Sequence, residues 1–222
     1  DPTPYRVWIS EIMLQQTVVN AVIDHFKRWM MRFPDVHTLA SSTQGQVLRL
    51  VEGLGYYNRA RNIFKSARII VAKHDGQVPD TYENLTELPG IGEYTASAIL
   101  SLAFDKPYPV LDANVRRVGR RILTIKNWDS KGSTLLRNYL KEAMEGESPG
   151  MFNEALMELG QTICFSENPL CNKCPVSSEC LAFRDSLQNE IPGKKKHKII
   201  SRHTFLIICF HKDKVLVELK KR

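Results

Sequence analysis

The sequence predicts an all-α domain over residues 1–192, followed by the beginning of a second, β-containing domain. Three observations lead to this expectation. Apolar residues recur at helical spacing through most of residues 1–165, and prolines and glycines separate the helical stretches. Four cysteines then gather within residues 164–180, where the helical repeat fades. Beyond a basic segment, two apolar runs flank a short polar turn, which is the pattern of a β-hairpin.

Two stretches show the helical repeat most clearly. Within residues 56–74, and again within residues 152–163, apolar side chains recur every three or four positions, as on the buried face of an amphipathic helix. No stretch before residue 165 alternates as a strand does, so we expect helices joined by short turns. The expected buried positions are Tyr57, Ala60, Ile63, Phe64, Ala67 and Val71 in the first stretch, and Phe152, Ala155, Leu156, Leu159 and Ile163 in the second.

The end of the chain differs in character from the helical part. Residues 193–200 are rich in lysine and have the composition of an exposed linker, and within residues 201–222 the apolar runs 204–210 and 215–219 flank a polar turn. Because a lone hairpin is marginally stable in water, we expect residues 201–222 to open a larger, truncated domain. The chain starts without an initiator methionine, so we expect it to be a piece of a longer protein.

Composition and charge limit the class of function. With 43% hydrophobic and 25% charged residues, the 222-residue chain has an ordinary globular composition, and no apolar run is long enough to cross a bilayer. A net charge of +7 suits a polyanionic partner, although a merely basic protein fits the same number. Five cysteines without a secretory signal favour a reducing compartment. We therefore expect a cytoplasmic, nucleoid-associated or nuclear protein that is neither secreted nor bound to a membrane.

The cysteine cluster predicts a metal centre. Cys164, Cys171, Cys174 and Cys180 follow the spacing C-x6-C-x2-C-x5-C, and four thiolates this close in sequence can enclose one centre. Structural zinc sites usually use two tight pairs separated by a longer loop, so this spacing favours an iron–sulfur cluster over zinc. Two disulfides or four free thiols are the alternatives, and a reducing compartment disfavours the first. Cys209 lies in an apolar run and is expected to be a buried strand residue instead.

A glycine-containing turn precedes one of the predicted helices. In the sequence LPGIGEYTA, residues 88–96, Gly90 and Gly92 let the backbone turn tightly and approach another molecule closely. The next helix then directs its free N–H groups and the positive end of its dipole toward an anion, so the turn can hold a phosphate without reading sequence. A generic G-x-G motif also occurs in ordinary helix–turn–helix connections.

Two carboxylates have contrasting predicted environments. Glu11 lies beside Trp8 and Ile12, where loss of solvent raises a carboxyl pKa and keeps the group protonated near neutrality. Asp112 is placed to cap a helix, where backbone N–H groups favour its ionised form. A neutral acid facing an ionised carboxylate is the arrangement that cleaves glycosidic bonds. A solvated helix residue and a simple capping residue are the ordinary alternatives, and the pairing requires a fold that joins the two positions.

Four features in this order resemble the MutY adenine DNA glycosylases of the helix-hairpin-helix superfamily. They are SEIMLQQT (10–17), GLGYY-x-RARN (53–62), LPGIGEYTA (88–96) with VLDANVRRV (110–118), and the cysteine spacing. The resemblance implies an all-α helix-hairpin-helix glycosylase fold with a [4Fe-4S] loop, acting as a monomer in base excision repair. It also implies a monofunctional enzyme that flips out and excises adenine mispaired with 8-oxoguanine or guanine in duplex DNA.

The resemblance further implies catalytic roles for matching residues. Glu11 would protonate the flipped adenine at N7 and then assist the incoming water. Asp112 would stabilise the positively charged sugar or form a transient adduct with it, with Asn114 beside it. Tyr94 occupies the position at which the related lyases carry a nucleophilic lysine, so an efficient Schiff-base route is not expected.

Other matching residues are expected at the DNA or at the cluster. Gln16 would fill the gap left in the base stack, next to Leu14 and Thr17, and Tyr56 would stack near the opposing oxidised guanine. Gly90 and Gly92 would offer N–H groups to a phosphate, with room for a bound monovalent cation, and Arg116 would lie close to the DNA. The four cysteines would ligate the [4Fe-4S] cluster.

Two rival interpretations remain open at the level of sequence. One is an endonuclease III-like pyrimidine glycosylase and AP lyase, which shares the hairpin, the aspartate and the cluster. The other is a structural DNA-binding module without catalysis. Relatives of the MutY type also carry a further N-terminal helical segment and a complete C-terminal domain, so we expect this chain to distinguish 8-oxoguanine from guanine poorly.

Overall fold

The computed structural model describes residues 3–15, 19–53, 55 and 57–193, together with the backbone of residues 210–211 and 214–215. Its helices are α1 (Pro4–Leu14), α2 (Val19–Arg32), α3 (Val36–Ala40), α4 (Gln44–Leu50), α5 (Tyr57–Lys73), α6 (Tyr82–Thr86), α7 (Glu93–Phe104), α8 (Ala113–Ile122), α9 (Ser130–Ala143), α10 (Pro149–Thr162) and α11 (Leu181–Arg184), with a 3₁₀ turn at Cys171–Lys173. The predicted all-α class is confirmed. Within the described residues, every helix is too short or too polar to span a bilayer.

Side-chain caps explain where many of these helices begin. A polar residue just before the helix accepts a hydrogen bond from the backbone N–H three positions later, which satisfies one of the donors left unpaired in the first turn. These caps are Thr3, Asp35, Thr43, Thr81, Asp112 and Asp129. Short-range sequence therefore determines the helix starts, and one of the caps is a predicted catalytic residue.

Helices α1 to α7 share one hydrophobic core, in which α1 and α7 pack against each other. The indole of Trp8 is fully buried in this core. The Tyr5 hydroxyl donates to the carbonyl of Phe33 at 2.8 Å and accepts from Trp29 Nε1 at 3.2 Å, so buried polar atoms are paired as well. Burial of this apolar surface is the main force that holds the group together.

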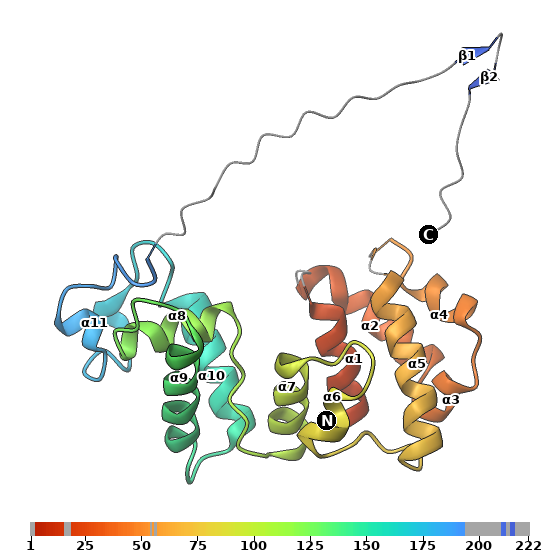
Figure 1. Ribbon diagram of the computed structural model, residues 1–222, viewed down its shortest axis with the longest axis horizontal. Coiled ribbons are helices and arrows are strands. Elements are labelled where there is room, and N and C mark those ends of the chain that lie inside the picture. Colours follow the sequence, from red (N-terminus) through yellow and green to blue (C-terminus); the bar gives the residue numbers. More distant parts are fainter. Residues whose placement is uncertain are drawn as a thin grey trace.

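Helices α8 to α11 form a second group beside the first (Figure 1). Val115 of α8 and Leu136 and Leu140 of α9 build one small core, and Val118, Ile122 and Leu159 build another against the cysteine loop. Helix α10 packs against both α7 and α8, so it joins the two groups. The position of α10 therefore controls how the two groups meet.

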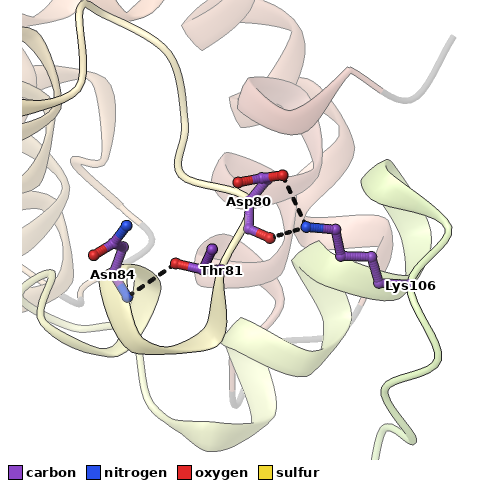
Figure 2. A network of polar contacts seen from close by, with 4 residues as sticks. All are labelled: Asp80, Thr81, Asn84 and Lys106. Atoms are coloured by element: carbon purple, nitrogen blue, oxygen red, sulfur yellow. Dashed lines mark hydrogen bonds and ion pairs between the residues drawn. The ribbon is translucent and has the colours of Figure 1, made fainter.

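Residues 105–111 carry the chain from α7 to α8, and we call them the crossing segment. At its start, Lys106 Nζ contacts the Asp80 carboxylate at 2.8 Å and also donates to the carbonyl of Asp80 (Figure 2). The same view shows the Thr81 hydroxyl capping α6 at the N–H of Asn84, 3.4 Å away. The two contacts of Lys106 with Asp80 attach the beginning of the crossing segment to the α1–α7 group.

The two predicted helical faces need correction in detail. In α5 the buried positions include Ala60, Ile63, Phe64, Ala67 and Ile70, whereas Val71 is half-buried and Tyr57, the first residue of the helix, is 44% exposed. In α10, Ala155 is exposed, and the buried set includes Gly150, Asn153 and Gly160. Small and polar residues face inward there because α10 approaches its neighbours too closely for large side chains.

The predicted hairpin is confirmed for four residues. Strands β1 (Phe210–His211) and β2 (Lys214–Val215) pair antiparallel, with Phe210 opposite Val215. Residues 194–209, including Cys209 and most of the basic linker, lie outside the described residues. The division into a helical domain and a second β-containing domain remains a prediction.

Candidate active site

Glu11 lies at the beginning of the last turn of α1, on the side that faces Tyr94 of α7. Its neighbours along the helix, Trp8 and Ile12, are buried in the core, and Glu11 itself is partly buried. Burial raises the pKa of Glu11, and a hydrogen bond from Tyr94 opposes that shift with a smaller effect. The carboxyl group therefore holds a proton at a higher pH than a solvated glutamate does, as its apolar surroundings predicted.

Tyr94 stands in the first turn of α7 and joins the two predicted acids. Its hydroxyl is hydrogen-bonded to Glu11. The pKa of Tyr94 is raised far above its ordinary value, first by burial and then by the negative charges of Glu11 and Asp112. Because both carboxylates act on the same phenol, the fold brings these distant positions within electrostatic range of Tyr94. The phenol itself stays neutral across the physiological pH range.

Asp112 caps α8 and has both carboxylate oxygens engaged. Oδ1 accepts from the backbone N–H of Val115 at 2.6 Å, and Oδ2 accepts from Asn114 Nδ2 at 3.1 Å. The Asn114 amide is oriented in turn, because its Oδ1 accepts from Arg117 Nη2 at 2.9 Å. A carboxylate held by two donors at a helix N-terminus has a fixed direction.

Arg117 extends this network to α10 and the cysteine loop. Its guanidinium donates to the carbonyls of Gly160 at 2.6 Å and of Cys164 at 2.7 Å. Arg117 was not among the residues predicted from the sequence. Its place one helical turn after Asn114 was the available signal, since residues three apart on a helix are neighbours. Asp112 is thus connected through Asn114 and Arg117 to the residue that begins the cysteine cluster.

The glycine turn has the predicted backbone at Gly90. Its φ is +85°, and a Cβ there would lie 2.9 Å from Asn62 Cβ, so the position favours glycine on two grounds. Ser66 of α5 donates to the carbonyl of Pro89 at 2.9 Å and anchors the turn. Gly92 caps α7 in an extended conformation, and a Cβ there would meet only open space. A phosphate has room to approach the first N–H groups of α7 at this point.

Three residues near the two acids in the sequence, Leu14, Gln15 and Arg116, have defined contacts in the structure. Leu14 ends α1 and packs against the first core. Its neighbour Gln15 donates from Nε2 to Thr95 Oγ1 at 3.1 Å and so ties the end of α1 to the start of α7. Arg116 is exposed, donates to the carbonyls of Leu111 and Asp112, and lies over the ring of Trp128.

Three residues assigned to the DNA by resemblance lie outside the described residues. They are Gln16, Thr17 and Tyr56. Their roles remain predictions.

The four cysteines surround one cavity, together with Arg121, Ile163 and Phe183. None of the four is joined to another in a disulfide. Burial raises the pKa of Cys171 and of Cys174, and the neighbouring thiols raise both further, which places all four close to one another. Within the described part of the chain, no three His, Cys, Asp or Glu side chains come together tightly enough for a single ion. Four soft sulfur donors spread around a cavity suit a multi-iron cluster better than zinc.

Arg121 lines this cavity and was also not predicted from the sequence. It is 2% exposed and donates to Cys164 Sγ at 3.2 Å and to the carbonyl of Phe165 at 2.6 Å. This buried guanidinium places a positive charge and an N–H donor directly beside one of the four sulfur atoms. The donor set and its surroundings therefore fit an anionic iron–sulfur cluster.

Residues 9–143 match the family profile described as HhH-GPD superfamily base excision DNA repair protein. The chain belongs to this superfamily. An adenine DNA glycosylase from Buchnera aphidicola subsp. Acyrthosiphon pisum is 42% identical over 214 residues, covering 95% of this chain and 61% of the relative. The adenine DNA glycosylase of Homo sapiens is 44% identical over 196 residues, covering 86% of this chain and 36% of the relative.

Among solved structures, a thermostable thymine-DNA glycosylase superposes with a TM-score of 0.76 at 26% identity, covering 83% of this chain and 86% of the other. The helix-hairpin-helix architecture inferred from the sequence is thereby confirmed. The chain spans about three fifths of the length of the bacterial relative, whose matched share is 61%. This HhH-GPD protein thus holds its two acids, its glycine turn and its cysteine cluster within the helical part that the structure describes.

Proposed function

We propose that the protein is a monofunctional adenine DNA glycosylase that hydrolyses the N-glycosidic bond of adenine opposite 8-oxoguanine or guanine in duplex DNA. The observation that supports it best is that Tyr94 is hydrogen-bonded to Glu11 and its pKa is also raised by the charge of Asp112, because this links an acid with a raised pKa to an oriented carboxylate. The names of the similar proteins support adenine as the base. Duplex DNA is the partner, and the cytoplasm, nucleoid or nucleus is the compartment where that partner is found.

The geometry supports a dissociative route. Glu11 donates its proton to N7 of an extruded adenine, and the electron pair of the C1′–N9 bond moves into the departing base. The sugar left behind carries positive charge, which the Asp112 carboxylate stabilises, with Asn114 holding that carboxylate in place. Water then adds to C1′ and returns its proton to Glu11. The acid is regenerated, so the balance is one adenine and one abasic site for each water.

Tyr94 argues against the lyase alternative. A Schiff base needs an amine, and the phenol at this position is neutral because burial and both neighbouring charges raise its pKa. Its role here is to hold Glu11 by a hydrogen bond. Borohydride should therefore trap little covalent DNA adduct, and trapping at the level of a true lyase would contradict the monofunctional assignment.

The cysteine loop supplies a structural cofactor site in this proposal. Cys164, Cys171, Cys174 and Cys180 would hold a [4Fe-4S] cluster, which when bound locks the loop between α10 and α11. Arg121 offers the anionic cluster a buried positive charge, and exposed Lys173 lies between two of the ligands, where it can meet a DNA phosphate. The protein itself binds and orients the DNA through Arg116 and the glycine turn, as a monomer.

The decisive experiment compares wild type with Glu11→Gln in single-turnover release of adenine from a duplex containing A opposite 8-oxoguanine. Loss of a general acid should slow release by about 100- to 10,000-fold while duplex affinity is retained. Glu142→Gln, an exposed carboxylate on α9, is the matched control and should behave as wild type. Adenine release by Glu11→Gln at the original rate would remove Glu11 from the mechanism.

The same assay separates the remaining alternatives. Duplexes with A opposite 8-oxoguanine, G, C or T report the mispair preference. A wild-type protein that binds all of these duplexes and releases no base would be a structural DNA-binding module. Release of a damaged pyrimidine instead of adenine would favour the endonuclease III-like interpretation.

A further inference from the structure

Asn153 is a fully buried polar residue on α10 that has no place in the mechanism above. Its side chain is 0% exposed. Its Nδ2 donates to the carbonyl of Tyr108 at 3.0 Å, and its Oδ1 accepts from the N–H of Val110 at 3.0 Å. One amide thus pairs with two backbone groups of the crossing segment, on either side of Pro109.

The crossing segment matters because of what it connects. It runs from α7, whose first turn carries Tyr94, to Asp112 at the start of α8. Val110 is two residues before Asp112, and it is fully buried, so the point where Asn153 holds the backbone lies next to that carboxylate. Pro109 restricts φ at the centre of the held stretch. Few backbone rotations therefore remain between Val110, where Asn153 holds the chain, and Asp112.

Helix α10 is suited to keep Asn153, and with it the crossing segment, in a fixed place. It packs against both α7 and α8. Close to its start, a Cβ on Gly150 would lie 3.1 Å from the carbonyl oxygen of Ser101 in α7, and close to its end, a Cβ on Gly160 would lie 2.6 Å from Asn114 Cβ in α8. Asn153 lies between these two close approaches. A single helix, α10, therefore contacts α7, the crossing segment and the start of α8 next to Asp112.

We propose that Asn153 is a positioning residue, which fixes the crossing segment so that Asp112 stands at the productive distance from the Glu11–Tyr94 pair. The inference rests on the proposed glycosylase function and deepens it. A leucine would fill the same volume without the cost of burying an amide, so packing alone does not explain an asparagine here. Without the amide, a buried N–H and a buried carbonyl lose their partners, and the segment is driven to shift toward water.

The test uses Asn153→Leu, which retains volume and removes both hydrogen bonds. Adenine release is measured under single-turnover conditions, and active sites are counted by titration with an uncleavable duplex, so that unfolded protein does not enter the rate. A displacement of reacting groups by about 1 Å costs on the order of 100-fold, so the rate per active site should fall by roughly 10- to 100-fold. Affinity for the uncleavable duplex should stay at the wild-type value, because the hydrogen bonds of Asn153 go to Tyr108 and Val110 and to none of the proposed DNA-binding residues.

A second variant covers the case in which Asn153→Leu fails to fold. Pro109→Gly leaves both hydrogen bonds possible and frees φ in the held stretch, so it should lower the rate per active site in the same direction by a smaller factor. Leu39→Ala, a fully buried change in α3 far from the crossing segment, is the control for destabilisation alone. It should lower the melting temperature and keep the wild-type rate per active site.

The outcomes are distinct. Wild-type rates per active site in both Asn153→Leu and Pro109→Gly would overturn the positioning role and leave Asn153 as a stabilising residue only. The positioning role would equally be overturned if Leu39→Ala slowed release as much as they do. A wild-type protein that releases no adenine would overturn the proposed function and this inference with it, and that result is recognised before any variant is compared.

Discussion

Gly160 offers the most direct test of how tightly the site depends on helix packing. In Gly160→Ala, the new Cβ would lie 2.6 Å from Asn114 Cβ and 3.2 Å from Asn114 Cα. Ordinary contacts between carbon atoms are about 3.5–4.0 Å, so the two helices must separate by roughly 1 Å. The atoms in the way belong to the start of a side chain and to backbone, which cannot rotate aside.

The displaced residue, Asn114, orients the Asp112 carboxylate, which we propose to be catalytic. Asn114 donates to Asp112, and the carbonyl of Gly160 accepts from Arg117, so the shift acts on the whole network at once. Misplacing reacting groups by about 1 Å costs on the order of 100-fold. Each factor of ten corresponds to about 1.4 kcal/mol, so a 100-fold loss puts the expected rise in the activation barrier at about 2.8 kcal/mol. Overpacking should also lower the free energy of unfolding by about 1–3 kcal/mol.

The assay is single-turnover adenine release per active site, together with the dissociation constant for an uncleavable duplex. Gly150→Ala is the matched control on the same helix, because its Cβ would meet the Ser101 carbonyl oxygen at 3.1 Å and needs a smaller shift away from the site. We expect a large loss of rate in Gly160→Ala, a small one in Gly150→Ala, and similar duplex affinity in both. Equal rates in the two variants would refute the link between the α8–α10 contact and the position of Asp112.

Four further predictions follow from contacts around the site. Burial raises the pKa of Glu11 in the folded protein. The free energy of unfolding is therefore unaffected by this group below the pKa of the unfolded chain, 4.5, and decreases as pH rises through the folded pKa. Glu11→Gln avoids this loss, so its melting temperature should exceed that of wild type by more at high pH than at low pH. Tyr94→Phe removes the hydrogen bond that lowers the pKa of Glu11, so the alkaline limb of the rate profile should move to higher pH. Arg117→Lys cannot reach its three acceptors together and should lower the free energy of unfolding by about 1.5–3 kcal/mol in urea titrations. Cys174→Ser should lose the broad visible absorbance of an iron–sulfur cluster, and unchanged absorbance would exclude Cys174 as a ligand.

Much of the site was predictable because it depends on local sequence. The apolar neighbours of Glu11 and the capping position of Asp112 are visible within a few residues, and the structure places both as expected. The meeting of the two acids was not visible, because it depends on α1 packing against α7 and on the path of the crossing segment. Tyr94 shows that both acids act at one point of the fold, because it is hydrogen-bonded to Glu11 and the charge of Asp112 raises its pKa.

The residues that the sequence did not reveal have a common cause. Apolar periodicity is defined by large hydrophobic side chains, and it therefore placed Ala155 on the buried face of α10 and passed over Asn153. Where helices approach closely, the interior positions are taken by glycine and by polar groups that pair with backbone. Such positions are set by the distance between helices, which a single sequence does not display.

The different tasks that we propose for the two acids follow from where each sits on its helix. Asp112 stands at a helix N-terminus, where the N–H of Val115 is available whatever else is bound, and Asn114 adds a second donor. Glu11 sits inside a helix, where every nearby backbone N–H is already paired within α1, and the resolved effects on its pKa are burial and the Tyr94 hydroxyl. If the two side chains were exchanged, the acid at position 11 would still have the surroundings of a proton donor, and the acid at position 112 would still have those of a carboxylate that stabilises charge. The position in the secondary structure is therefore the reason why we propose Glu11 as the group that gives a proton and Asp112 as the group that stabilises charge.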